Sequence, residues 1–152
     1  MNTTLLISIF TKNWDQINMP LKELLLRSDK TLLYFYPKDN TPGCTKEAED
    51  FTRLQSEFIK QGIQIVGISR DTLDSHKKFT VSCALGIDLI SDQSEELHAA
   101  FSVIGEKNNY GKITIWVIRS TFLLDSTGNI LNEWRNVKAT WHAEKILREI
   151  TK

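Results

Sequence analysis

The apolar positions of the chain form short blocks with two different spacings. The segments Thr31 to Tyr36 and Ile63 to Ile68 are rich in β-branched, leucine and aromatic residues, which is typical of strands buried on both faces of a sheet. Between them, apolar residues recur at helical spacing from Ala48 to Phe58, and Gly62 follows where such a helix is expected to end. This pattern predicts a strand–helix–strand unit.

The remaining segments predict further strands and helices on both sides of this unit. A strand over 5–10, its hairpin partner over 14–19 and a helical turn over 22–26 precede it. A helix over 74–85, a short strand over 87–90 and a helix capped by Ser94 follow it. We then expect a loop over 103–115, a strand over 116–124, a turn over 126–129, a partner strand over 130–134 and a last helix capped by Thr140.

This order of elements predicts an α/β domain. The early strand–helix–strand units favour parallel strands with right-handed crossovers, and the last two strands favour an antiparallel hairpin at the edge. A mixed central sheet flanked by helices on both sides is the thioredoxin-like arrangement. No repeat, linker or low-complexity tract divides the 152 residues, so we expect one domain over 1–152.

Composition excludes several classes of partner. The chain has 19 basic and 19 acidic residues, and this balance argues against a surface for nucleic acid or for an anionic membrane. No apolar stretch approaches the roughly 20 residues of a membrane span. The apolar run near the N-terminus lacks a basic start and a small-residue cleavage site, so no signal peptide is expected. We therefore expect a soluble cytoplasmic protein.

The two cysteines, Cys44 and Cys83, are too few for a disulfide scaffold and suit a reducing compartment. Cys44 follows a buried strand and a short loop. Thr41 is a good N-cap and Pro42 suits the first helical position, so Cys44 falls in the first turn of the next helix. The free N–H groups and the helix dipole favour an anion there, and the thiolate is the reactive form of cysteine. The sequence therefore indicates a nucleophilic thiol rather than a packing residue.

The spacing of Pro37, Thr41 and Cys44 resembles the signature of the peroxiredoxins, and Thr-Pro-Gly-Cys-Thr resembles their bacterioferritin comigratory protein, or Q-type, group. The resemblance runs from about Thr31 to Ile150. It implies a thioredoxin-like peroxidase that reduces hydrogen peroxide and organic hydroperoxides, uses thioredoxin or a similar thiol, needs no cofactor and is often monomeric. Further matches follow in order at Val66-Gly67-Ile68-Ser69, Leu89-Ile90-Ser91-Asp92, Tyr110-Gly111-Lys112 and Arg119-Ser120-Thr121-Phe122-Leu123-Leu124-Asp125.

The resemblance implies a role for each matched residue. Cys44 attacks the peroxide and becomes a sulfenic acid. The Thr41 hydroxyl and the backbone N–H groups of Gly43 and Cys44 hold the peroxide, and Pro37 shields the thiolate from water. Arg119, expected inside a buried strand, stabilises the charge that develops as the O–O bond breaks. The plainer alternatives are a simple helix cap for Thr41, a strand end for Pro37 and a solvent-facing edge-strand side chain for Arg119.

The chain departs from the group at the second cysteine. Many members carry it five residues after the first, where this chain has Glu49, so a local disulfide is excluded. Cys83 is the one candidate for resolving the sulfenic acid, but it falls about one turn beyond the usual position, on the same helix face as Phe79. The sequence leaves open whether Cys83 resolves or whether Cys44 works with an external thiol.

Glu47 and the histidines also allow more than one interpretation. Glu47 lies one turn after Cys44 and either pairs with Arg119 or is a first-turn acid favoured by the dipole. No histidine has a metal-ligand spacing to a cysteine or an acid, so no metal site is expected. We predict that all three histidines lie on the surface: His76, His98 and His142.

Two other functions fit the predicted fold. A thiol–disulfide oxidoreductase normally needs Cys-x-x-Cys, and here Lys46-Glu47 occupies the place of the second cysteine. A non-enzymatic binding or chaperone module would not need the combination of residues that this chain retains: Pro37, Thr41, Cys44 and Arg119.

Overall fold

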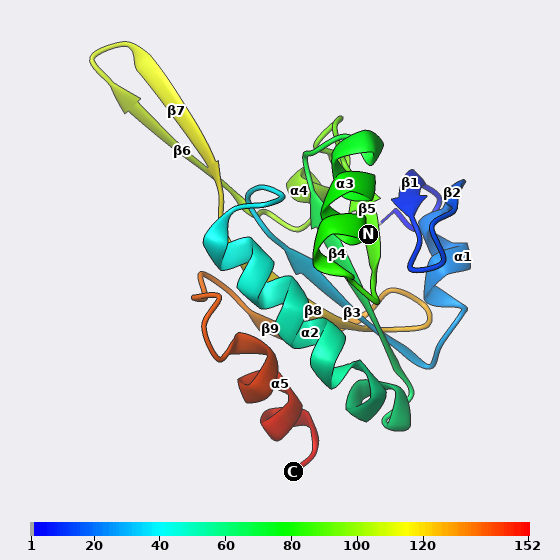
Figure 1. The fold of residues 1–152 in the computed structure, drawn as a ribbon. Coiled ribbons are helices and arrows are strands. Elements are labelled where there is room, and N and C mark those ends of the chain that lie inside the picture. The colour runs from blue at the N-terminus through cyan, green and yellow to red at the C-terminus, as the bar shows by residue number, and fades with distance from the viewer. Residues whose placement is uncertain (1) are drawn as a thin grey trace.

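The structure, a computed structural model that describes residues 2–152, contains a seven-stranded sheet, a two-stranded ribbon and five helices (Figure 1). The strand order of the sheet is β2-β1-β5-β4-β3-β8-β9. These strands are β1 (Leu6–Phe10), β2 (Gln16–Pro20), β3 (Lys30–Phe35), β4 (Ile63–Ser69), β5 (Asp88–Ser91), β8 (Ser120–Asp125) and β9 (Ile130–Trp134). The ribbon pairs β6 (Ile104–Asn109) with β7 (Lys112–Val117), and the helices are α1 (Leu21–Leu25), α2 (Pro42–Lys60), α3 (Leu73–Cys83), α4 (Glu96–Ala100) and α5 (His142–Ile150).

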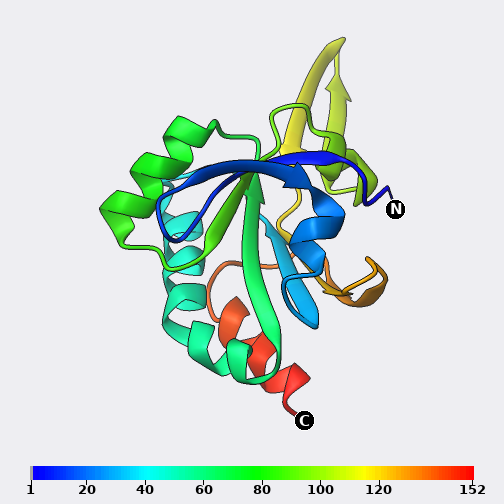
Figure 2. The same cartoon turned by 90° about the vertical axis from the view of Figure 1, so that its right-hand side faces the viewer.

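Helices cover both faces of the sheet, as the view in Figure 2 makes clear. On one face, buried aromatic residues of α2 and α3 meet Ile146 of α5 in a core that includes Phe51, Phe58 and Phe79. On the other face, α1 and α4 bury leucine side chains against β3 and β4. The predicted mixed sheet, thioredoxin-like in arrangement, is therefore confirmed.

The topology determines where a site can form. Strands β3, β4 and β5 are parallel, so their carboxyl ends meet at one edge of the sheet, where α2 and α3 begin. Strand β8 is antiparallel to β3, and its first residue, Ser120, pairs with Phe35 at the end of β3. The residue just before β8, Arg119, therefore lies beside the loop that leads from β3 into α2.

A close approach in the sheet makes Gly67 sensitive to substitution. An added Cβ there would lie 2.8 Å from Tyr34 Cζ and 2.9 Å from Leu89 Cδ2, both in the packed core. Gly67→Ala is expected to lower the free energy of unfolding by about 1–3 kcal/mol, because these side chains must shift within a dense interior. Urea unfolding measures this change in free energy. An unchanged midpoint would show that the core accommodates the added methyl group without losing stability.

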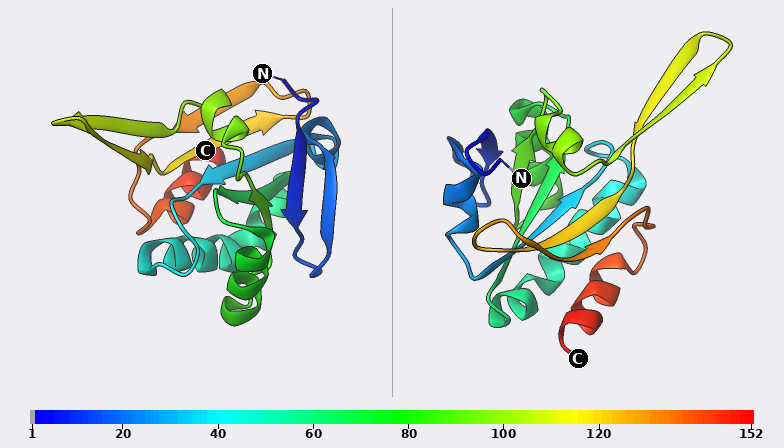
Figure 3. Two further views of the ribbon diagram at one scale, coloured as in Figure 1. Left: turned by 90° about the horizontal axis from the view of Figure 1, so that it is seen from above. Right: turned by 180° about the vertical axis from the view of Figure 1, so that it is seen from behind.

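The segment after α4 differs from the sequence-based expectation. We expected a loop over 103–115 and one strand over 116–124, but β6 and β7 form a ribbon that projects from the body (Figures 1 and 3). Residues 118–119 then interrupt the strand structure before β8 begins. Trp116 covers Gly105 so closely that a side chain on Gly105 would collide with the indole ring. Strand β6 is mostly polar and exposed, so no apolar alternation reveals it, and the alternating Ile113, Ile115 and Val117 of β7 lie largely in the segment expected to be a loop.

Two predicted caps are also wrong. Helix α4 follows Glu95 rather than Ser94, and α5 follows Trp141 rather than Thr140. Both N-cap residues have a left-handed backbone and neither side chain caps its helix. Ser94 Oγ still accepts a hydrogen bond from the Glu96 N–H at 3.4 Å, and the Asp92 carboxylate accepts from the N–H groups of Leu97 and His98, so side chains before Glu95 satisfy the start of α4.

The prediction that the histidines lie on the surface is wrong. All three are buried: His76 bonds to Asp39 and His142 to Thr121, both far away in the sequence, and His98 bonds to Asp92, six residues before it. Within residues 2–152, no group of three or more His, Cys, Asp or Glu side chains is arranged to hold a metal ion. Over the same residues, no helix combines the length and the apolar character needed to cross a membrane.

Candidate active site

Cys44 lies in the first turn of α2, where the sequence predicts it. The helix starts at Pro42 after the N-cap residue Thr41, and the Cys44 side chain is only 2% exposed. Thr41 does not cap the helix with its side chain. Its hydroxyl instead donates to the carbonyl oxygen of Lys38, at 2.9 Å. The site thus combines a buried thiol, free helix N–H groups and a hydroxyl held by the preceding loop.

Arg119 connects the thiol to a buried carboxylate. Its Nη2 lies 3.2 Å from the Cys44 sulfur, and its Nη1 donates to Oε1 of Glu47. Arg119 belongs to the two-residue break between β7 and β8, which corrects the expectation that it lies inside a strand. This break lets the side chain turn toward α2 instead of following the alternation of a strand.

Burial and charge act together on Glu47 and Arg119. Burial raises the pKa of Glu47 to about 7, and the Arg119 guanidinium opposes this rise. Burial by itself would lower the pKa of Arg119, but Glu47 and Cys44 raise it, and the net shift is upward. Arg119 therefore keeps its positive charge beside the sulfur. Of the two sequence-based interpretations of Glu47, the geometry favours pairing with Arg119.

Two further residues border the site and were missed by sequence reasoning. Tyr34 is fully buried, and burial together with the nearby Glu47 and Cys44 raises its pKa, so it remains a neutral phenol. Burial and then Arg119 lower the pKa of His142 to about 4, so this imidazole is neutral, with Nε2 2.7 Å from Thr121 Oγ1. Tyr34 pairs with Thr121 across β3 and β8, and Thr121 in turn contacts His142. The register of these two strands is therefore the signal that connects Tyr34 and His142.

Among the described residues 2–152, neither Pro37 nor Cys83 makes a hydrogen bond or an ion pair with Cys44, Glu47 or Arg119. Pro37 follows the end of β3 and is exposed. Cys83 is the last residue of α3 and is half-buried, whereas the start of α3, at Ser75 and His76, is the part that contacts the loop before Cys44. At about 1.5 Å per helical residue, Cys83 lies roughly 10 Å further along α3 than His76, and the sulfurs of Cys44 and Cys83 are not bonded to each other.

The fold and the site define a thiol peroxidase of the thioredoxin-like class: an arginine-paired cysteine at a helix start, with no second cysteine beside it. Residues 6–132 match the model of the AhpC/TSA family. The chain belongs to this family.

Its relatives are peroxiredoxins. The chain is 44% identical to the "Putative peroxiredoxin bcp" of Helicobacter pylori over 91% of this chain and 90% of that protein. It is 48% identical to "Peroxiredoxin Bcp" of Xanthomonas campestris over 76% of this chain and 72% of that protein. These matches confirm the peroxiredoxin resemblance and its Bcp, or Q-type, group.

Solved structures agree. A structure of the Xanthomonas campestris bacterioferritin comigratory protein, described as giving insight into its alkyl peroxide reduction activity, matches with a TM-score of 0.85 at 38% identity, covering 99% of this chain and 92% of that one. A Cys-to-Ser mutant of Xylella fastidiosa PrxQ matches with a TM-score of 0.86 at 33% identity, covering 99% and 89%. The chain is thus a peroxiredoxin, a peroxidase that works with a peroxide substrate and a thiol reductant.

Proposed function

We propose that Cys44 is the peroxidatic cysteine of this peroxiredoxin and that Arg119 activates it. The observation that carries this proposal is the 3.2 Å contact between Arg119 Nη2 and the Cys44 sulfur at the start of α2. A cation beside the sulfur and the positive end of a helix both favour the thiolate, which is the nucleophile.

In the proposed reaction the Cys44 thiolate attacks one oxygen of the hydroperoxide. The S–O bond forms as the O–O bond breaks, Cys44 is oxidised to a sulfenic acid, and the other oxygen leaves with a proton as water or an alcohol. The Thr41 hydroxyl and the N–H groups of Gly43 and Cys44 hold the peroxide. Arg119, held in place by Glu47, stabilises the charge on the separating oxygens. Pro37 limits the access of water to the thiolate.

The substrates we propose are hydrogen peroxide and organic hydroperoxides. The alkyl peroxide activity named for the Xanthomonas campestris protein supports the organic substrates, since that protein shares the fold over nearly the whole chain. No metal or organic cofactor is needed, because the two electrons come from the thiol itself.

We further propose that the chain works as a monomer in the cytoplasm and is reduced by thioredoxin or a similar thiol, with no nucleic-acid or membrane partner. Both cysteines are free, which suits a reducing compartment. The charge balance of 19 basic and 19 acidic residues gives no field for attracting polyanions.

Cys83 is the proposed resolving residue. It is the second thiol of the chain, and unwinding of α3 would free it to reach Cys44 within the roughly 7 Å Cα separation that a disulfide allows. Cys83→Ser is expected to leave the first reaction with peroxide unchanged and to trap Cys44 as a sulfenic acid, which excess peroxide converts to the sulfinic acid. Intact-protein mass spectrometry follows these species. A wild-type protein that gains one oxygen and never loses two hydrogens would instead be a one-Cys enzyme.

Consumption of a hydroperoxide by the purified protein, supplied with dithiothreitol or with thioredoxin and its reductase, tests the proposed function. We expect turnover with both reductants and loss of turnover in Cys44→Ser. Reduction of insulin disulfides without peroxide consumption would support a thiol–disulfide oxidoreductase. Absence of both activities would support a binding or chaperone module.

A further inference from the structure

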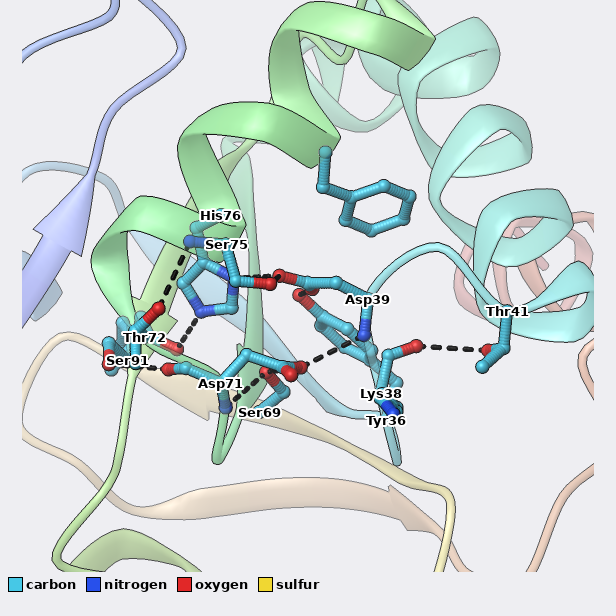
Figure 4. A network of polar contacts seen from close by, with 12 residues as sticks. Tyr36, Lys38, Asp39, Thr41, Ser69, Asp71, Thr72, Ser75, His76 and Ser91 are labelled. Atoms are coloured by element: carbon cyan, nitrogen blue, oxygen red, sulfur yellow. Dashed lines mark hydrogen bonds and ion pairs between the residues drawn. The ribbon is translucent and has the colours of Figure 1, made fainter.

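A second polar cluster lies beside the Cys44 loop, and the proposed reaction does not use it (Figure 4). Its centre is Asp39, which lies in the loop between β3 and α2 and is buried. The Asp39 N–H donates to Asp71 Oδ2 at 2.9 Å. Its carboxylate accepts from the Tyr36 hydroxyl at 2.6 Å and from Ser75 Oγ at 2.8 Å. The same carboxylate lies 2.7 Å from Nδ1 of His76, in the first turn of α3.

The contacts of His76 define where its protons are. Nε2 lies 3.0 Å from the carbonyl oxygen of Ile90, which only accepts, so Nε2 carries a hydrogen. Nδ1 faces a carboxylate oxygen of Asp39 at 2.7 Å, and two bare acceptors would repel each other at that distance. A proton therefore lies between them. Two hydroxyl groups also donate to Asp39, so the short contact between His76 and Asp39 is part of a network that fills the carboxyl group with hydrogen bonds.

The hydrogen-bonded pair of His76 and Asp39 is shielded from water and anchored to the sheet. The side chains of His76 and Asp39 are 0% and 1% exposed. Asp71, which holds the Asp39 backbone, accepts a hydrogen bond from Ser69 Oγ at 2.7 Å, and its carbonyl accepts one from Ser91 Oγ at 2.6 Å. Ser69 and Ser91 are the last residues of β4 and β5. The α3 side of the cluster is thus fixed to the ends of two central strands.

The loop side of the cluster leads to the peroxide site. Lys38, next to Asp39, provides the carbonyl oxygen that accepts the Thr41 hydroxyl. Asn40, between Asp39 and Thr41, has a left-handed backbone with φ of 62°, which local hydrogen bonding must hold in place. Fixing Asp39 therefore fixes the carbonyl that orients Thr41 and the entry of the chain into α2.

We propose that the hydrogen-bonded pair of Asp39 and His76 is a latch that fastens the Cys44 loop to α3 and holds it in the peroxide-binding conformation. Both are positioning residues, and neither touches the peroxide. Because the latch binds α3 as well as the loop, unwinding of α3 and loss of the peroxide-binding conformation occur together. This inference rests on the proposed role of Cys44 as the residue that reacts with peroxide.

The test compares two rates in His76→Leu, which removes both ring hydrogen bonds. We expect the rate constant for Cys44 with hydrogen peroxide to fall about 10- to 100-fold, since the loop no longer orients the substrate. Alkylation of Cys44 by iodoacetamide does not need a bound peroxide, so its rate is expected to change by less than about threefold. His76→Asn places an amide N–H near the position of Nδ1 and is expected to restore most of the peroxide rate.

A matched control is present on the other face of the sheet. His98 is also fully buried, with Nδ1 2.6 Å from Asp92 Oδ2, and it packs against Phe35 rather than against the Cys44 loop. His98→Leu is expected to lower stability but to leave the peroxide rate unchanged. If His76→Leu does not fold, the double variant Asp39→Asn with His76→Leu leaves no buried carboxyl group without its partner and serves in its place.

Hydrogen–deuterium exchange gives the second readout. In the His76 variant we expect faster exchange both in the loop 37–41 and in the first turn of α3, because one latch holds both. A His76→Leu protein that is less stable yet reacts with peroxide at the wild-type rate, or whose loop exchange is unchanged, would overturn the latch. If instead the wild type does not react with peroxide at Cys44, the proposed function fails before the latch is tested.

Discussion

Replacement of Cys44 by Ser is expected to abolish peroxidase activity, with a loss on the order of 10³-fold or more, while the fold is retained. A serine hydroxyl is almost un-ionised at neutral pH, whereas a thiol beside Arg119 and at a helix start supplies a thiolate. The substitution replaces one small buried atom by another, so the expected cost in stability is only about 1 kcal/mol. Stopped-flow mixing with peroxide measures the rate, and circular dichroism follows the fold.

Cys83→Ser is the matched control for this experiment, because it removes the other thiol at the far end of α3. It should leave the first reaction with peroxide unchanged. Turnover of Cys44→Ser within about tenfold of the wild type would mean that another group attacks the peroxide, since a hydroxyl cannot match the thiolate.

Replacement of Arg119 by Met is expected to slow attack on peroxide by about 100- to 1,000-fold, which is the usual cost of removing one donor that stabilises transition-state charge. Arg119 is the cation in contact with the Cys44 sulfur, so the variant should also hold less thiolate at neutral pH. Its loss removes the group that lowers the pKa of Glu47, so burial is expected to raise that pKa beyond about 7. Two pH profiles, for iodoacetamide alkylation and for peroxide reaction, separate these effects.

Arg148→Met, at an exposed position of α5, is the control for loss of a positive charge elsewhere. It should change neither profile. If Arg119→Met leaves both the alkylation profile and the peroxide rate as they are in the wild type, Arg119 does not act on the sulfur.

The sequence predicted the parts of the fold that bury a regular face. The segments 31–36 and 63–68 are continuous apolar blocks, and they form the parallel pair β3 and β4. The ribbon of β6 and β7 escaped prediction because β6 is mostly polar and exposed, and because only two residues separate the apolar residues of β7 from those of β8. The starts of α4 and α5 were missed because left-handed residues, Glu95 and Trp141, directly precede them.

The site was predictable where chemistry and spacing are local. Thr41, Pro42 and Cys44 lie within one turn of a helix start, and their residue types indicate that start. The partners of this segment come from other parts of the chain. Asp39 meets His76 across 37 positions and Arg119 meets Cys44 across 75, and only the strand register brings such residues together. The buried histidines were predicted on the surface because the spacing among histidines does not reveal their partners, which are Asp39, Asp92 and Thr121.

The most direct measurement is peptide mass spectrometry of the reduced wild-type protein after one equivalent of peroxide, with dimedone present to trap sulfenic acid. We expect Cys44 to carry the dimedone adduct, or to be joined to Cys83 in a disulfide, while the peroxide is consumed. Consumption of the peroxide with Cys44 recovered as an unmodified thiol would contradict the claim that Cys44 reacts with peroxide.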